Sequence, residues 1–451
     1  MISDDVNDFD PYAPGVGACP YPHFARLRYE RPVHRVPGRE LYLVSRYADC
    51  VAVVKNTAVF SNDHDLLQQG HGDETGFAPP AYADVQDIYA QAYPNIETLH
   101  FLDPPHHTQQ RRRINRWFSS RRAEQTWLSL VETLVDELIS RFERDGRVEF
   151  MQQFAVPLPI RAIAGILGVS TDREADFKRW SDSFVAAMGV DLSHDGWLAK
   201  AHSHVEMQRF FMQEIEARIE RPTDDLLGEL VAAATGPLPD DPAAEQPFTV
   251  LEVLNAVQHL LAAGNETTTQ AIGQAMRLLV ENQDQLARLR AEPELIPNAV
   301  EEALRVETPT VGMWRYCREN TDVGGTVIPA GALVAVMFGS ANRDDELFDD
   351  ADAFRVDRPN ASRHLAFGQG IHFCVGAPLA RLELQVALRQ LLERLPNLRL
   401  APGTLLEFGE SFLLRNLRAL PLEFDVRSRA EPGDESAPRV RSLVPSSAVH
   451  E

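Results

Sequence analysis

The stretch HLAFGQGIHFCVGAPLAR, residues 364–381, places one cysteine among glycines directly before an apolar run. Its spacing F-x-x-G-x-x-x-C-x-G is formed by Phe367, Gly370, Cys374 and Gly376. A thiolate that binds iron needs a turn that exposes its sulfur, backbone N–H groups that hydrogen-bond it, and small residues that let a flat macrocycle approach. The apolar run predicts a helix, whose positive N-terminal end would further stabilise the anion. Cys374 is therefore the candidate metal ligand.

The composition of the chain limits the partners and the location that we expect. With 451 residues, the chain is long enough to bury a large core. Its formal net charge of -22 argues against a nucleic acid or an anionic membrane as partner. The four cysteines are scattered without a CxxC pair, so we expect no disulfides. An acidic N-terminus and the lack of an apolar run of about 18 residues predict a cytoplasmic protein without a membrane anchor.

Helical periodicity dominates from about residue 103 to 282, and residues 249–282 have the pattern of one long apolar helix. The stretch 63–94, which contains Gly, Asp and Pro, predicts a long irregular connection. Residues 427–451 lack periodicity and aromatic side chains, which predicts a disordered tail. We predict one large domain over residues 1–426, mainly α with a minor β region. Shorter elements are predicted as strands at 41–45, 326–328 and 332–338 and as helices at 47–56 and from about 378.

The long predicted helix contains the segment Ala263-Gly264-Asn265-Glu266-Thr267-Thr268. A glycine inside a helix costs about 1 kcal/mol relative to alanine, so Gly264 implies a compensating reason. Local distortion of the helix, which would leave room for a small ligand, is such a reason. Taken alone, the segment is more typical of a core helix flexed by glycine and threonine, with Glu266 at its surface.

Two further patterns place charged side chains on helical faces. Glu302 and Arg305 stand at i,i+3, and FRVDR at 354–358 follows them with Arg358. The run DPPHHTQQRRR at 103–113 sets His107 and Arg111 at i,i+4. Either pattern alone is common on solvated helices. The two patterns indicate a functional site only because they occur together with the cysteine loop.

Taken together, these motifs resemble those of the cytochrome P450 superfamily, most closely its soluble bacterial members, from about residue 20 to 424. The resemblance implies the mainly α cytochrome P450 fold and one haem b (iron protoporphyrin IX) bound through Cys374. It implies that the haem contacts Phe367, Gly370, Gly376, Ala263 and Gly264, and that its propionates are held by His107, Arg111, Arg315 and His372. A buried ion network with a structural role would join Glu302, Arg305 and Arg358.

The resemblance also implies a monooxygenase that inserts one atom of O2 into an apolar substrate. Thr267 would hydrogen-bond dioxygen and Glu266 would relay protons, although many relatives carry Asp at the position of Glu266. No flavin or iron–sulfur segment is evident, so two electrons would come from NAD(P)H through an external ferredoxin and ferredoxin reductase. A peroxide-driven peroxygenase and a haem-thiolate sensor are the alternatives. The Glu266–Thr267 pair favours dioxygen, and the tail is too short for an output domain.

Arginines cluster within and after the run 103–113, which predicts a docking site for an acidic ferredoxin. The alternative is a solvated helix face. The arginines concerned are Arg112, Arg113, Arg116, Arg121 and Arg122.

Periodicity outlines a substrate pocket. Val311 and Met313 share strand parity with Arg315, so we expect them to face the haem while Trp314 points away. Leu413 and Leu414 match the family's other pocket-lining hairpin. His259 and Ala263 lie eight and four residues before Thr267 on one helical face, with Ala262 beside them. His259 is either a satisfied core histidine or the partner of a polar group on the substrate.

Overall fold

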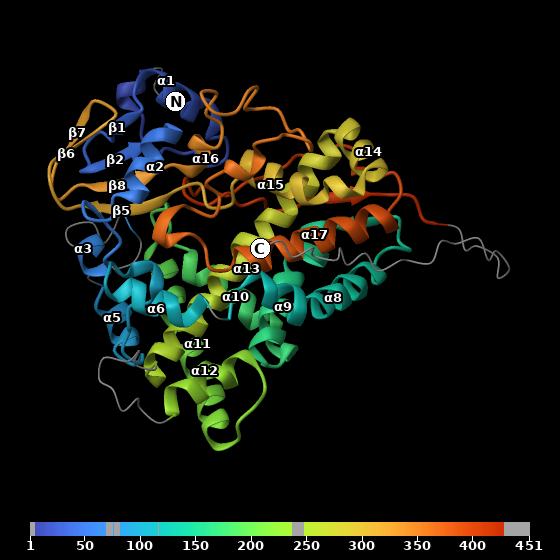
Figure 1. Cartoon of the computed structure of the whole chain (residues 1–451), viewed down its shortest axis with the longest axis horizontal. Coiled ribbons are helices and arrows are strands. Elements are labelled where there is room, and N and C mark those ends of the chain that lie inside the picture. Colours follow the sequence, from blue (N-terminus) through green and yellow to red (C-terminus); the bar gives the residue numbers. More distant parts are fainter. Residues whose placement is uncertain (1–4, 69–74, 76–81, 116, 237–247, 428–451) are drawn as a thin grey trace, which may run out of the picture.

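The computed structural model describes residues 5–68, 75, 82–115, 117–236 and 248–427. Helices dominate this part of the chain and the strands form small sheets, so the prediction of a mainly α fold with a minor β region is confirmed. Figure 1 shows a roughly triangular outline with most strands at one corner and α13 crossing the centre. The predicted disordered tail, apart from Arg427, and Arg116 lie outside the described residues.

The α-helices of the described chain extend over these residues. They are α1 (Tyr21–Glu30), α2 (Tyr47–Lys55), α3 (His64–Gln68), α5 (Ala83–Tyr89), α6 (His106–Asn115), α7 (Ser120–Arg122), α8 (Leu128–Ser140), α9 (Pro157–Leu167), α10 (Glu174–Val185), α11 (His194–Glu220), α12 (Leu226–Thr235), α13 (Val250–Glu281), α14 (Gln283–Ala291), α15 (Ile296–Val306), α16 (Phe338–Ala341) and α17 (Ala377–Arg394). None of these helices combines the length and the apolar character needed to cross a membrane.

The longest helix, α13, is fixed at its start by Thr249. The Thr249 hydroxyl accepts the N–H of Glu252 at 3.2 Å, and the Glu252 carboxylate accepts the N–H of Thr249 at 2.7 Å. This capping box satisfies two backbone donors that a helix otherwise leaves open. Behind it, α13 packs against α9, α10, α11, α15 and α17. The predicted helix at 249–282 is thus confirmed, and it forms the central support of the fold.

The strands form one five-stranded sheet and two smaller sheets. The larger sheet has the order β1-β2-β8-β5-β3, in which only the β2–β8 pair is parallel. Within it, Arg315 on β5 lies opposite Val334 on β8. The strands are β1 (Val33–Arg35), β2 (Leu41–Val44), β3 (Phe60–Ser61), β4 (Arg147–Glu149), β5 (Met313–Cys317), β6 (Thr321–Val323), β7 (Thr326–Ile328), β8 (Leu333–Val336), β9 (Arg399–Leu400) and β10 (Pro421–Glu423).

Two sequence predictions of local structure need correction. The run 332–338 is not one strand, because β8 ends at Val336 and α16 begins at Phe338. The stretch 63–94 is not wholly irregular, because it contains α3 and α5. Both helices are too short to display a hydrophobic period. Tertiary contact supports α5, whose Val85 packs with Trp197 and Ala201 of α11.

A buried ion network joins α15 to the segment that follows the larger sheet. Glu302 accepts Arg305 Nε at 2.7 Å and Arg358 Nε at 2.9 Å, with all three side chains at most 2% exposed. Each guanidinium also donates to the backbone carbonyl of Ala353. The structure therefore brings together the three residues that the sequence grouped. Because each charge meets opposite charge or carbonyl oxygen, the network ties α15 to residues 349–358.

Candidate active site

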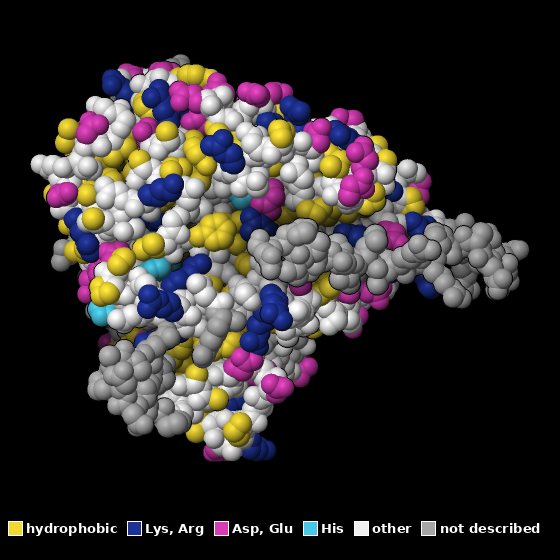
Figure 2. Space-filling model, in the orientation of Figure 1, with side chains coloured by type: hydrophobic (Ala, Val, Ile, Leu, Met, Phe, Trp, Pro, Cys, Tyr) yellow, Lys and Arg dark blue, Asp and Glu magenta, His cyan; other side chains and the backbone are white. Residues whose placement is uncertain are grey.

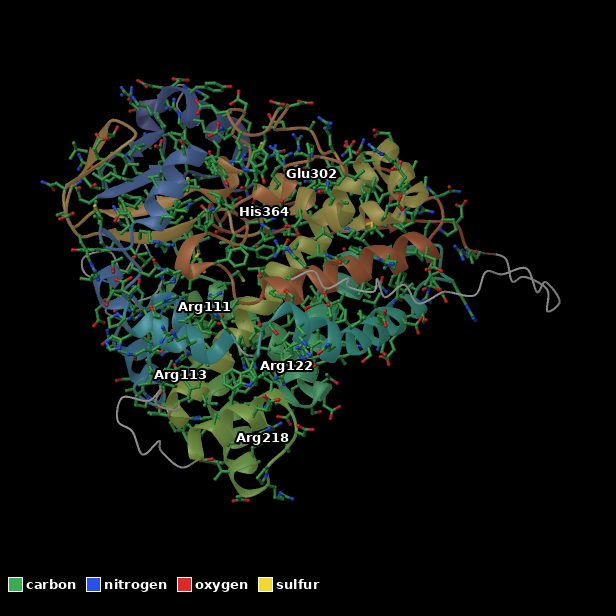
Figure 3. The ribbon with its side chains drawn as sticks, in the orientation of Figure 1. Arg111, Arg113, Arg122, Arg218, Glu302 and His364 are labelled. Carbon is green, nitrogen blue, oxygen red and sulfur yellow. The ribbon has the colours of Figure 1, made fainter. Side chains whose placement is uncertain are left out.

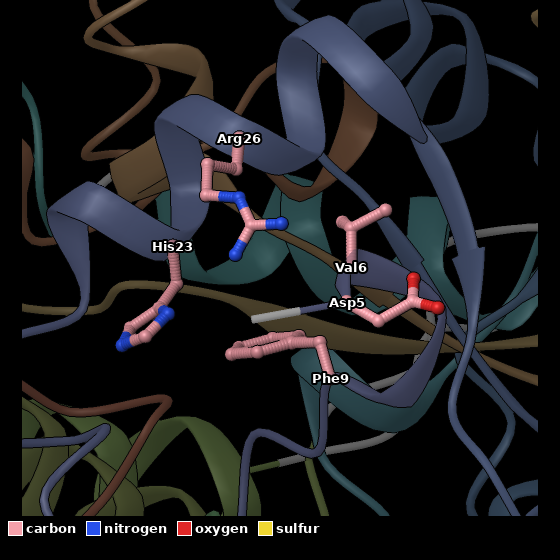
Figure 4. Close-up of a pocket in the computed structure, with 5 residues that line it drawn as sticks. All are labelled: Asp5, Val6, Phe9, His23 and Arg26. Carbon is pink, nitrogen blue, oxygen red and sulfur yellow. The ribbon is translucent and has the colours of Figure 1, made fainter. Parts of the chain in front are cut away.

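Two surface cavities do not have the character of an active site. Figure 4 shows the smaller, at the N-terminal end, where Phe9 stacks on His23 with ring centroids 5.3 Å apart and Arg26 nearby. Its volume of about 10 Å³ leaves no room for a substrate. The larger, of about 460 Å³, is an open groove between α2 and the outer side of residues 362–373. The candidate ligand Cys374 is not among the residues that line either cavity.

The cysteine loop, residues 364–376, is shaped by glycines in the left-handed region of the backbone map. Gly368 and Gly370 have φ of 68° and 75°, which other residues adopt only with strain. The turn lets the Cys374 N–H donate to the carbonyl of Phe367 at 2.8 Å. The sulfur then receives backbone N–H groups of Gly376 and Ala377 at the start of α17. The local sequence alone therefore orients Sγ towards a ligand.

The thiol of Cys374 is not a free thiolate in its protein surroundings. Burial raises its pKa above the ordinary value, and this outweighs the backbone donors and the charge of Arg111 on α6. The side chain nevertheless remains accessible to small molecules. An enclosed but accessible thiol that needs a cation to lose its proton fits a metal ligand, because metal binding deprotonates a coordinating thiol.

Four nitrogen-bearing side chains meet beside the cysteine loop, and none of them forms an ion pair with a carboxylate of the described residues. The rings of His107 and His372 lie 4.3 Å apart, and all four ring nitrogens are buried without a hydrogen-bond partner. Arg315 is buried and donates to the Trp314 carbonyl at 2.6 Å, while Arg111 makes no ion pair with a described residue. Figure 3 shows Arg111 on α6, on the side of that helix where the cysteine loop lies.

The four side chains beside the cysteine loop are suited to binding an anion. Burial lowers the pKa of His107 to about 4 and that of His372 to about 2, so both imidazoles are neutral at neutral pH. Burial also lowers the pKa of Arg315 to about 10. Buried donors without acceptors are costly, and a bound dicarboxylate would satisfy them. A thiol ligand beside such donors fits haem, whose two propionates are carboxylates.

The segment 263–268 of α13 offers both space and a hydroxyl. The Thr267 hydroxyl donates to the Ala263 carbonyl at 2.7 Å, and a Cβ added to Gly264 would meet no atom within 4 Å. The helix runs without a break from Val250 to Glu281, so Gly264 does not interrupt it. The bond from the Thr267 hydroxyl to the carbonyl four residues earlier is of a kind that often bends a helix slightly. The space comes from the missing side chain alone.

Glu266 is buried and belongs to a polar chain that reaches α10. Its side chain is 9% exposed, accepts Gln270 Nε2 at 3.2 Å and lies 3.5 Å from Lys178 Nζ. Lys178 also donates to Asp182, whose side chain is 48% exposed. Burial raises the pKa of Asp182 to about 6 against the opposing effect of Lys178. Glu266 therefore connects to solvent through two groups, neither of which was predicted from the sequence.

The predicted pocket residues fall into two groups. Val311 and Leu413 are fully buried side by side, with the Val311 N–H donating to the Leu413 carbonyl at 2.7 Å. Leu414 is buried beside them, in an isolated bridge with Thr310. Val311 packs in the same core cluster as Trp314, whereas Met313 borders another cluster. The predicted alternation therefore does not extend to Val311, because β5 begins only at Met313.

On α13, Ala263 is exposed, whereas Ala262 is fully buried. His259 lies one turn before Ala263, and its ring is 4.8 Å from that of His100 in the single-turn helix η2 (Leu99–Phe101). His100 was not among the predicted site residues. Its only sequence signal is its place just before the motif at 103–113, and a lone histidine there is not distinctive.

Comparisons with known proteins cover nearly the whole chain. The family model described as Cytochrome P450 matches residues 50–400. The cytochrome P450 monooxygenase PikC of Streptomyces venezuelae is 37% identical over 431 residues, which are 94% of this chain and 95% of PikC. The 6-deoxyerythronolide B hydroxylase of Saccharopolyspora erythraea is 35% identical over 412 residues, which are 90% of this chain and 96% of the hydroxylase. The structure of cytochrome P450 CYP109Q5 from Chondromyces apiculatus has a TM-score of 0.79 and 33% identity, and the match covers 94% of this chain and all of that one.

Proposed function

Because the chain belongs to the cytochrome P450 family, we propose that it inserts one atom of dioxygen into a C–H or C=C bond of an apolar small molecule. It is a monooxygenase, as its relatives are named. The observation that carries the proposal is the placement of the Cys374 sulfur among backbone donors, beside four buried ring nitrogens of His107 and His372 that have no hydrogen-bond partner in the described chain. When bound, haem supplies the activation of dioxygen and the transfer of one oxygen atom.

The chain's own residues would hold the haem from two sides. Cys374 would ligate the iron, and the N–H groups of Gly376 and Ala377 would limit the charge on its sulfur. His107 and Arg111 on α6 would bind the propionates together with Arg315 and His372. Phe367 would pack beside the haem, with its ring held by the Arg381 guanidinium at 4.6 Å.

Proton delivery would use the polar chain from α10 to α13. Asp182 exchanges protons with solvent, Lys178 bridges, and Glu266 receives the proton next to Thr267. A carboxyl with a pKa of about 6 is well matched to proton transfer near neutral pH. Thr267 would present its hydroxyl to dioxygen, since Ala263 and Gly264 bring no side chain larger than a methyl group to that turn.

Electrons would arrive from NAD(P)H through a ferredoxin reductase and an acidic ferredoxin. Figure 2 shows Lys and Arg side chains over the face on which α6 lies. Not every predicted arginine is available there, because Arg113 lies 3.8 Å from Glu252 and Arg122 is paired with Glu229. Arg112 and Arg121 are exposed and form no ion pair with described residues, so they are the best contacts for the ferredoxin. NAD(P)H and a reduced Cys374 both fit the cytoplasm, which is the location we propose.

The experiment combines the haem-loaded protein, a ferredoxin, its reductase and NADPH under heavy-isotope dioxygen. Substrates are first selected by the spectral shift they cause in a screen of terpenoids, steroids, fatty acids, aromatics and macrolides. We expect one labelled oxygen atom in the product for each molecule oxidised. Turnover with hydrogen peroxide but not with the ferredoxin system would instead identify a peroxygenase. A spectral shift without any turnover would identify a sensor.

A further inference from the structure

One buried nitrogen in the predicted pocket has no hydrogen-bond partner in the described part of the chain. His259 Nδ1 lies 2.8 Å from the carbonyl oxygen of Asn255, one turn earlier on α13. His259 Nε2 is buried and has no hydrogen-bond partner among the described residues. The ring is therefore tied to the helix through one nitrogen and aims the other away from it.

The hydrogen bond to Asn255 decides which nitrogen carries the proton. A carbonyl oxygen can only accept, so Nδ1 must be the donor. Burial lowers the pKa of His259 to about 4, which keeps the ring neutral at physiological pH and leaves no second proton. His259 Nε2 is consequently a lone-pair acceptor, and it can be satisfied only by a group that donates a hydrogen bond.

Aromatic rings from two other elements surround this acceptor. The ring centroid of Phe184 on α10 lies 4.9 Å from that of His259 at an interplanar angle of 83°, and the His100 ring lies 4.8 Å away. Phe101 completes the wall at 6.3 Å. Because Nε2 is buried, a ligand would reach it only when one of the surrounding side chains rotates.

His259 also has a defined position relative to Thr267. It precedes Thr267 by eight residues on the same helical face, which corresponds to about 12 Å along the helix axis. A group bound at His259 would thus set how far into the pocket the rest of the molecule reaches.

We propose that His259 Nε2 selects substrates that carry a hydroxyl or N–H donor about two helical turns, or roughly 12 Å, from the end that lies beside Thr267. The inference rests on the proposed function, because it names the substrate class of that same site. A carbonyl or ether oxygen in the same place could not donate a hydrogen bond, so it would face the acceptor Nε2 with a second acceptor. A site built for a donor rejects the analogue that lacks it, because the buried acceptor is then left unpaired.

The test compares alcohols with their matched ketones, using testosterone with androstenedione and 2-dodecanol with 2-dodecanone. Dissociation constants are measured by equilibrium dialysis on the haem-loaded wild type, His259→Phe and His100→Phe. We expect the wild type to bind the alcohol of at least one pair about tenfold more tightly than the ketone, since a buried hydrogen bond is worth about that factor. The ratio of the ketone's dissociation constant to the alcohol's should fall to about one in His259→Phe. It should persist in His100→Phe, which keeps the ring and removes its nitrogens.

A second measurement does not depend on the choice of ligand. NMR of isotope-labelled histidine in the diamagnetic carbon monoxide form, assigned with His259→Phe, reports the tautomer directly. We expect Nε2 of His259 to be unprotonated. A protonated Nε2, equal affinity for alcohol and ketone in both pairs, or a preference that survives His259→Phe would each overturn the proposal. The carbon monoxide spectrum, recorded on the same samples, tests the haem assignment separately.

Discussion

At the scale of single residues, the site divides into groups that local sequence positions and groups that only the fold brings together. Cys374 could be found from its neighbours because Gly368, Gly370 and Gly376 shape the turn and flank the sulfur within one loop. Lys178 and Asp182 could not be predicted from their neighbours, since they reach Glu266 from a helix about ninety residues earlier. Nothing in the sequence of α10 distinguishes this i,i+4 pair from pairs on any solvated helix.

The hydroxyl of Thr267 gives the first prediction. Replacing Thr267 with Ala removes the group that would hydrogen-bond dioxygen but leaves the haem-binding residues intact. We expect NADPH oxidation to continue while product falls about tenfold or more and peroxide rises, because proton transfer to oxygen loses its local donor. The measurement is the ratio of product to NADPH consumed. Thr268→Ala, which alters the buried neighbour, is the control, and unchanged coupling in Thr267→Ala would remove Thr267 from the mechanism.

At the scale of secondary-structure elements, long periodic segments could be predicted and short ones could not. The predicted helix at 249–282 matches α13 because a capping box and a sustained apolar period mark it. The helices α3 and α5 escaped notice because five and seven residues are too few to reveal a period. A second buried network was missed for another reason. Glu307 forms ion pairs with Arg277, Arg343 and Arg415, which come from three separate segments of the chain. The distances between these residues in the sequence follow no pattern from which the contacts could be predicted.

The ion network at α15 gives the second prediction. Glu302→Gln would leave two buried guanidinium groups facing an uncharged amide. Removing one partner of a buried ion pair costs about 3–5 kcal/mol, so we expect a loss of that order in the free energy of unfolding measured with urea. Glu292→Gln breaks a solvent-exposed pair with Arg288 and should change stability far less. Equal effects of the two substitutions would show that the network is not structural.

The exposed face of α6 gives the third prediction. Arg112→Glu should slow reduction of the haem protein by an acidic ferredoxin several-fold at low ionic strength, because the steering field is reversed locally. Added salt should narrow the difference from the wild type, since the Debye length falls to about 10 Å at 0.1 M. Stopped-flow reduction measures both effects. Arg209→Glu makes the same charge change on α11 and serves as the control. A wild-type rate for Arg112→Glu at low salt would reject the docking face.

At the scale of the whole molecule, one buried carboxyl makes stability depend on pH. Glu383 on α17 is 2% exposed, and its Oε2 has no hydrogen-bond partner in the described chain. Burial raises its pKa from the ordinary 4.5 to about 8. The folded state therefore holds a proton that the unfolded chain releases above pH 4.5. The resulting stabilisation is fully present at acid pH and is lost as pH rises towards 8.

Glu383→Gln tests this directly, because the amide keeps the shape of the neutral carboxyl and cannot ionise. Relative to the variant, the wild type should lose a few kcal/mol of unfolding free energy between about pH 5 and pH 8, since each unit of pKa shift corresponds to about 1.4 kcal/mol. Chemical denaturation across that range measures the difference. A difference that does not change with pH would mean that Glu383 titrates normally.

The fold as a whole would hold a haem between the cysteine loop and α13. The most direct test is the spectrum of the reduced protein under carbon monoxide, recorded for the wild type and for Cys374→Ser. We expect a strongly red-shifted Soret band in the wild type and its loss in the variant, because a serine oxygen is a poor replacement for a thiolate. A wild type without the shifted band, or a Cys374→Ser variant that retains it, would contradict the assignment of Cys374 as the haem ligand.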